Sequence, residues 1–169
     1  SAARNFALEK AASSWVLALD ADEELVGDEG DLRLLVEGEQ KCEAFFLPLI
    51  NPSGETSGDY NCYHVLRLFR NNGLIHYQGR IHEQVILSAN GTAGFAVRPL
   101  IRHKLLPAVE RRRKRGRNLA ALKKALAGDP ANPFLLYYTG VEWLMLGKAS
   151  RALPFLEKAY RNLGNNILF

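Results

Sequence analysis

The sequence predicts a mixed α/β domain that is followed by a helical region. An apolar run at 15–19 precedes several β-like segments, and two Asn-Gly pairs, at 72–73 and 90–91, are typical of tight turns between strands. Further along the chain, apolar residues recur at three- and four-residue spacing, which is the period of an amphipathic helix. We therefore expect an α/β domain in 1–106 and helices in 107–169.

The first elements are expected in the order helix, strand, helix, strand. Residues 4–12 have helix-forming composition and end in small polar residues. The run at 15–19 is apolar throughout, which predicts burial on both faces, as in the parallel sheet of an α/β protein. A short helix closed by Gly38 is expected over 28–38, and a strand over 42–50.

The middle of the chain is expected to form a meander of antiparallel strands. A loop rich in Gly, Pro, Ser and Asn covers 51–61. Each Asn-Gly pair lies between two β-like runs, so each is expected to close a hairpin.

Composition is ordinary for a soluble globular protein. The 169 residues are 47% hydrophobic and 24% charged, and no apolar run reaches the ~20 residues of a membrane span. The N-terminal ten residues carry charge and lack an apolar centre, so we expect a cytoplasmic chain. Cys42 and Cys62 lack the paired spacing of a zinc or redox site and are expected to be free thiols.

The net charge of +4 conceals an asymmetry along the chain. Residues 1–59 carry thirteen acidic and four basic side chains, whereas residues 98–124 carry eleven basic and one acidic. The densest run is "ERRRKRGR" at 110–117, which is either a solvated helix face or a surface for nucleic acid, anionic lipid or a phosphorylated ligand. Nucleic-acid binding there would weaken steeply with salt.

The stretch "WVLALDADEEL" crowds four carboxylates, Asp20, Asp22, Glu23 and Glu24, after an apolar run. Like charges this close repel one another unless a cation lies among them. One interpretation is a strand end followed by a solvated, acidic helix start. The other is a hard divalent metal ion held by carboxylate oxygens.

Further polar clusters could be either structural or functional. Arginines often lie on edge strands, and histidines are often buried in cores with their hydrogen bonds satisfied. The clusters are Arg4-Asn5, the pair Arg67 and Arg70, His82-Glu83, and His103.

A resemblance favours the functional interpretations. The segment "ARNFALEKAASSWVLALDADEEL" resembles the approach to the DxD motif of inverting GT-A glycosyltransferases of family 2. The segments "RLFRNNGLIHYQGRIHEQV" and "IRH", followed by the helical tail, resemble the branch of that family with tetratricopeptide repeats. The resemblance covers nearly the whole chain and implies a partial GT-A sheet domain with a tetratricopeptide-like hairpin.

The resemblance also implies roles for individual residues. Asp20, Asp22 and His103 would hold a divalent ion, Mn²⁺ or Mg²⁺, that neutralises the departing diphosphate. Glu83 would be the carboxylate that takes the proton of the acceptor. A nucleotide-sugar donor and an unknown acceptor would be the partners. The residues expected to contact them are Arg4, Asn5, Arg67, Arg70 and His82.

The helical tail carries apolar and small residues at the offsets of a 34-residue tetratricopeptide repeat. Within this pattern Gly140 and Ala152 would let two helices approach closely. The runner-up function is therefore a non-catalytic binding module that uses these helices and the basic run.

The family's nucleoside-binding first half would precede Arg4, but only three residues do, so the chain resembles the C-terminal part of such an enzyme. The strand at 15–19 would then lack neighbours, and open edges recruit other chains. A homodimer, or a partner chain that covers the sheet, is accordingly expected.

Overall fold

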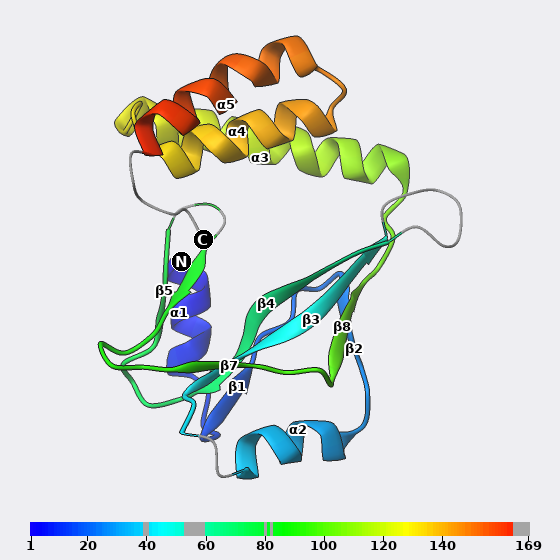
Figure 1. Cartoon of the computed structure of the whole chain (residues 1–169), viewed down its shortest axis with the longest axis vertical. Helices are drawn as coiled ribbons and strands as arrows, with labels where there is room; N and C mark the ends of the chain where they lie inside the picture. Colours follow the sequence, from blue (N-terminus) through cyan, green and yellow to red (C-terminus); the bar gives the residue numbers. More distant parts are fainter. Residues whose placement is uncertain (39–40, 53–59, 80, 82, 164–169) are drawn as a thin grey trace. The chain divides into compact units, whose positions relative to one another are not determined.

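The chain forms two compact units in this computed structural model, Ser1–Leu105 and Leu106–Phe169 (Figure 1). The first unit combines strands and helices, and the second is helical. The predicted mixed α/β class is therefore confirmed. The structure describes residues 1–38, 41–52, 60–79, 81 and 83–163.

The first unit is built on a mixed, curled sheet in the order β1-β4-β3-β8-β2, with β7 paired to β3 (Figure 1). Pairing is antiparallel for β1–β4, β3–β4 and β2–β8, and parallel for β3–β7 and β3–β8. A separate two-stranded antiparallel sheet holds β5 and β6. The strands are β1 (Trp15–Leu17), β2 (Glu23–Val26), β3 (Ala44–Pro52), β4 (Tyr60–Arg70), β5 (His76–Gln78), β6 (Gln84–Ile86), β7 (Ala93–Phe95) and β8 (Leu100–His103).

β1 packs on both of its faces, but it does not lie in a parallel sheet. Trp15 and Leu17 contact one core cluster, which includes Phe45, while Val16 contacts a second cluster around Phe69. The apolar run therefore predicts two-sided packing correctly. The parallel arrangement is wrong, because β1 pairs with β4 in the antiparallel sense and ends the described sheet. An apolar run reports how many faces are covered and carries no information on strand direction.

The two Asn-Gly pairs form turns but do not close hairpins. The side chain of Asn72 accepts hydrogen bonds from the backbone N–H of Leu74 and Ile75, and Gly73 has a φ of 75°. The strands on either side belong to different sheets, since β4 pairs with β1 and β3 whereas β5 pairs with β6. In the same way β7, which follows the second pair, joins β3 rather than β6. The predicted meander is therefore wrong.

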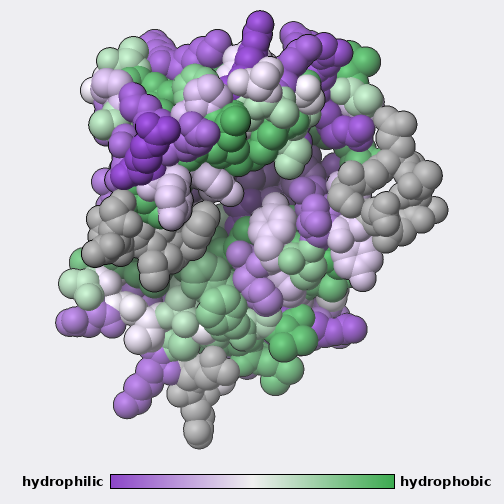
Figure 2. Space-filling model, turned by 45° about the horizontal axis from the view of Figure 1, so that its top comes forward, coloured by the Kyte–Doolittle hydropathy of each residue, from purple (hydrophilic) through white to green (hydrophobic). Residues whose placement is uncertain are grey.

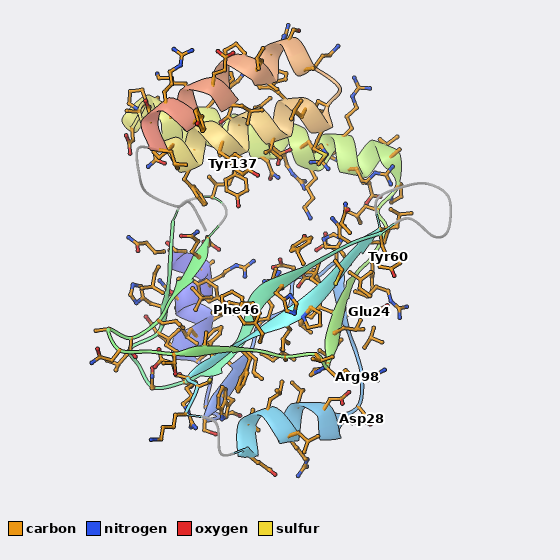
Figure 3. The ribbon with its side chains drawn as sticks, in the orientation of Figure 1. Glu24, Asp28, Phe46, Tyr60, Arg98 and Tyr137 are labelled. Atoms are coloured by element: carbon orange, nitrogen blue, oxygen red, sulfur yellow. The ribbon has the colours of Figure 1, made fainter. Side chains whose placement is uncertain are left out.

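Two short helices lie against the sheet unit. Helix α1 spans Ala2–Glu9, somewhat before the predicted range. Helix α2 spans Glu29–Glu37 and ends at Gly38, as predicted. Asp28, labelled in Figure 3, lies at the start of α2. It forms a capping box, because its side chain accepts from the N–H of Asp31 while the Asp31 side chain accepts from the N–H of Asp28.

The described residues of the second unit form helices α3 (Ala108–Gly128), α4 (Pro133–Met145) and α5 (Ala149–Leu163). Helices α4 and α5 pack closely where Gly140 faces Leu156, since a Cβ atom at Gly140 would lie 2.6 Å from Leu156 Cδ2. Ala152 is fully buried at the same seam. The small residues therefore allow the close approach that the repeat pattern predicts.

The surface of the helical unit combines hydrophilic and apolar side chains. Figure 2 shows both kinds on the face that it draws, and Val109 and Met145 are among the exposed apolar residues. No helix in the described part of the chain is long and apolar enough to cross a membrane.

Candidate functional site

Every carboxylate of the acidic stretch lies beside a basic side chain, and Arg67 is shared by Asp20 and Glu23. The stretch is the turn from β1 into β2, and the expected acidic helix start is instead a strand. Asp20 contacts Arg4 and Arg67, and Asp22 Oδ2 lies 3.3 Å from His103 Nε2. The basic side chains nearby offset the repulsion expected among these crowded carboxylates.

Glu24 is paired on the surface, and its partner comes from the neighbouring strand. Its Oε1 lies 3.3 Å from Arg102 Nη1, and the two residues face each other in the β2–β8 register. The side chains are 41% and 52% exposed, so this pair contributes little to stability.

A β-bulge in β4 presents Arg67 to the acidic turn. In the register between β3 and β4, Phe45 faces Leu68 and the next residue, Phe46, faces Leu66, so Arg67 has no opposite residue. Bulges re-aim a side chain and are common next to active sites. Nη2 of Arg67 lies 3.0 Å from Asp20 Oδ2 and 2.5 Å from Glu23 Oε1.

Glu23 is the buried member of the acidic stretch. Its side chain is 2% exposed, and both of its carboxylate oxygens are used. Oε1 accepts from Arg67, and Oε2 accepts from the backbone N–H of Asp20 at 2.9 Å. Glu23 therefore closes the turn that carries Asp20 and Asp22.

The Asp20 carboxyl group is held in its ionised form. Burial alone would raise its pKa, but the charges and hydrogen bonds of Arg67 and Arg4 outweigh burial and lower the pKa below the ordinary value of 3.8.

Arg4 joins the acidic turn to Glu83. Its Nη2 lies 2.5 Å from Asp20 Oδ1, and its Nε lies 2.8 Å from Glu83 Oε2. The Arg4 guanidinium also lies over the Tyr77 ring, 5.3 Å from the ring centroid. Two residues with separate predicted roles, 63 positions apart, are thus linked by one arginine.

Asn5 fastens α1 to β5. Its Nδ2 donates to Tyr77 O at 3.0 Å, and its Oδ1 accepts from Tyr77 N at 2.7 Å. Both ends of the amide are therefore engaged by one backbone unit. Strand β5 is therefore held against the helix that carries Arg4.

A cavity of about 400 Å³ lies beside this network, between α1 and β1. Its apolar wall comes from residues such as Leu8, Val16 and Ala18, and Arg4 and Asp20 supply its charged groups. Ligand pockets commonly combine such apolar walls with a few polar groups.

Asp22 and His103 carry carboxylate and imidazole donor atoms of the kinds that divalent ions use in proteins. In the described part of the chain, no group of three or more His, Cys, Asp or Glu side chains is arranged to hold a metal. Magnesium, however, is often held by one or two carboxylates together with substrate phosphates. Both oxygens of Asp20 are paired with arginines, so its role as a ligand stays a prediction.

The other two predicted donor contacts are Arg70 and His82. Arg70 lies over the Trp15 ring, with its guanidinium carbon 4.7 Å from the centroid. His82 lies outside the described residues.

Glu23 belongs to the acidic stretch, but no role of its own was predicted for it from the sequence. Its signal was the alternation of Glu23 and Leu25 along a strand, which places both on one face. Leu25 packs against the core cluster of Phe45, and Glu23 is buried with it.

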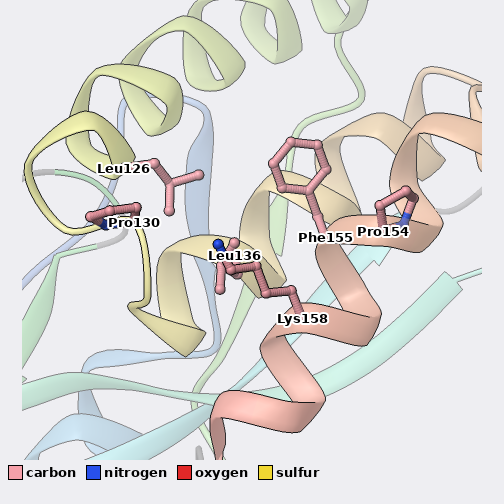
Figure 4. A pocket seen from close by; sticks show the side chains of 6 residues that line it. All are labelled: Leu126, Pro130, Leu136, Pro154, Phe155 and Lys158. Atoms are coloured by element: carbon pink, nitrogen blue, oxygen red, sulfur yellow. The ribbon is translucent and has the colours of Figure 1, made fainter.

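A second cavity lies wholly within the helical unit (Figure 4). It measures about 270 Å³, and its lining is mainly apolar. The lining residues are Leu126, Pro130, Leu136, Pro154, Phe155 and Lys158.

Comparison with known proteins relates this chain to a glycosyltransferase. The chain is 27% identical over 164 residues to the SPbeta prophage-derived glycosyltransferase SunS of Bacillus subtilis (strain 168), and equally to glycosyltransferase SunS of Bacillus phage SPbeta. The match covers 95% of this chain and 38% of each relative. No protein-family model matches the chain. The similarity extends over both units, and the chain spans well under half the length of these relatives.

Proposed function

We propose that this chain forms part of a metal-dependent inverting glycosyltransferase of the GT-A type, which transfers a sugar from a nucleotide donor to an acceptor. Support for transfer in general comes from the similarity to SunS. The finer assignment rests on the resemblance of the DxD segment and on one contact set, the bridge that Arg4 makes between Asp20 and Glu83.

In this proposal the two ends of the bridge have different tasks. Asp20, Asp22 and His103 would hold the divalent ion, which would neutralise charge on the leaving diphosphate. Glu83 accepts the proton of the acceptor as the new bond to the sugar carbon forms. Arg4 sets the separation between them by contacting both sides.

The arginines have a second task toward the donor. Arg4 and Arg67 already bind carboxylate oxygens, and a guanidinium binds phosphate oxygens by the same planar, charged geometry. The apolar cavity beside Arg4 offers a surface for the uncharged part of the donor. Arg70 and His82 remain proposed donor contacts on the resemblance alone.

Glu83→Gln in the full protein that contains this chain tests the proposal. A base acts in the transition state, so we expect kcat to fall by about 100-fold or more while donor affinity changes less than about twofold. Glu24→Gln is the matched control, because it makes the same change of charge at an exposed pair. Near-normal turnover by Glu83→Gln would eliminate Glu83 as the base.

A protein-binding module is the second candidate, and the apolar cavity of the helical unit favours it. The tetratricopeptide assignment of α4 and α5 belongs to this candidate as well. Phe155→Asp should then abolish capture of a partner protein, whereas Leu153→Asp, which changes a 57% exposed residue on the same helix, should not. Sugar transfer by the full protein would count against a purely non-catalytic role.

A further inference from the structure

We propose that Glu23 is a positioning residue that presets the conformation of Asp20 and Asp22 through its buried pair with Arg67. This inference rests on the proposed function for its catalytic meaning. The arrangement of Glu23 itself is a separate observation that can be tested without any sugar transfer.

The burial of the pair shows that it differs from the surface pairs of the same turn. The Glu23 and Arg67 side chains are 2% and 14% exposed, whereas Glu24 is 41% exposed. Arg67 Nε is also buried without a hydrogen-bond partner in the described part of the chain. A buried ion pair with an unsatisfied donor is weak evidence for stabilisation and points to a role in fixing geometry.

The two oxygens of Glu23 act on two different donors. Oε1 accepts from Arg67 Nη2, and Oε2 accepts from the backbone N–H of Asp20. Arg67 Nη2 in turn donates to Asp20 Oδ2. Asp20 is therefore held at its backbone directly and at its side chain through Arg67, and both constraints meet at Glu23.

The far side of the same turn is held by the sheet. The backbone N–H of Lys104 donates to Asp22 O at 2.7 Å, and Glu23 lies opposite His103 in the β2–β8 register. Because His103 is also the partner of Asp22, the side chain of Glu23 and the strand pairing together fix both aspartates.

A carboxylate is required at this position because it has two acceptor oxygens. Glutamine has the same shape but one acceptor, so Glu23→Gln can satisfy Arg67 or the Asp20 N–H, and the other donor then meets an NH₂ group. Loosening of the turn is the expected consequence. Glu24→Gln makes the same charge change one residue away, at an exposed pair, and is the matched control.

The test is amide hydrogen exchange of Asp20 in the native chain and in both variants, with global stability measured in parallel. We expect Asp20 to exchange at least about tenfold faster in Glu23→Gln, beyond any change in global stability, and to be unchanged in Glu24→Gln. Mn²⁺ affinity, followed by water-proton relaxation, should fall about tenfold in Glu23→Gln alone.

A double variant covers the case in which Glu23→Gln does not fold, since removing one charge of a buried pair is strongly destabilising. Glu23→Gln with Arg67→Gln removes both charges, and its Asp20 amide should also exchange about tenfold faster than in the native chain. Native-like exchange of Asp20 in every folded variant that lacks Glu23 would overturn the inference. Absence of Mn²⁺ binding by the native chain would count against the proposed function and leave the exchange result to decide the role of Glu23.

Discussion

Nη2 of Arg4 lies 2.5 Å from Oδ1 of Asp20, and the two residues come from a helix and from the turn that follows a strand. The opposite oxygen of Asp20 is bound by Arg67. Asp20 is thus an anion between two cations, which explains why it remains ionised in a half-buried position. Because Asp20 contacts both arginines, a change in its ionisation should alter the stability of the site.

Acid should weaken the fold through Asp20. Its pKa is lower in the folded chain than the ordinary value of 3.8, so its stabilising contribution is complete above that value and is lost as pH falls through it toward the folded pKa. We expect the melting temperature of Asp20→Asn to be lower than native near pH 6, and the difference to shrink as the pH is lowered below 3.8. A constant difference between the two proteins over this range, measured by circular dichroism, would contradict the prediction.

Asn5→Asp should destabilise the sheet unit. The change keeps the acceptor for Tyr77 N but places a carboxylate oxygen against Tyr77 O, where Nδ2 now donates. A lost hydrogen bond that leaves a partner unsatisfied costs about 1–3 kcal/mol. Urea unfolding measures this, with Asn61→Asp on the exposed part of β4 as control. Equal free energies of unfolding for the two variants would show that Asn5 has no special role.

Gly140→Ala should destabilise the helical unit, because the new Cβ would lie 2.6 Å from Leu156 side-chain atoms. Overpacking of this kind costs about 1–3 kcal/mol. Gly116→Ala is the control, since a Cβ there meets no atom within 4 Å, and removing a helical glycine should stabilise by about 0.5–1 kcal/mol. In thermal unfolding, Gly140→Ala is therefore expected to lower the melting temperature and Gly116→Ala to raise it. A neutral or stabilising effect at Gly140 would mean that α4 and α5 can separate without loss.

Self-association is expected along β1. Within the described chain β1 pairs with β4 only, and Leu19, just beyond it, is an exposed leucine. Unpaired strand edges recruit other chains, and a lysine on the edge blunts them. Light scattering should show a dimer for the native chain and a monomer for Leu19→Lys. A native monomer at micromolar concentration would remove the expectation of a homodimer.

Local features of the fold were predictable, and long-range pairing was not. Gly38 marked the end of α2, and the apolar run at 15–19 indicated two-sided packing, because both depend on neighbouring residues. The Asn-Gly pairs predicted turns correctly. They did not predict the pairing of the flanking strands, which do not pair with each other. Strand pairing such as β3 with β7 joins segments about fifty residues apart, and no local pattern encodes it.

In the candidate site too, the sequence predicted individual residues but not the contacts that depend on the fold. The resemblance indicated Asp20, Asp22, His103 and Glu83, and the structure brings Asp22 to His103 and links Asp20 to Glu83 through Arg4. The carboxylates of the turn differ in how deeply they are buried, and their burial depends on the pairing of the strand that follows. For that reason Glu23 could not be distinguished from its neighbours by charge.

The central claim is that the acidic turn holds a divalent ion for sugar transfer, and a Mn²⁺ titration of this chain followed by water-proton relaxation tests it most directly. The account predicts one saturable Mn²⁺ site in the native chain, lost in Asp22→Asn and retained in Glu24→Gln, since Asp22 meets His103 whereas Glu24 pairs with Arg102 on the surface. No saturable binding, or binding that is the same in Asp22→Asn as in the native chain, would contradict it.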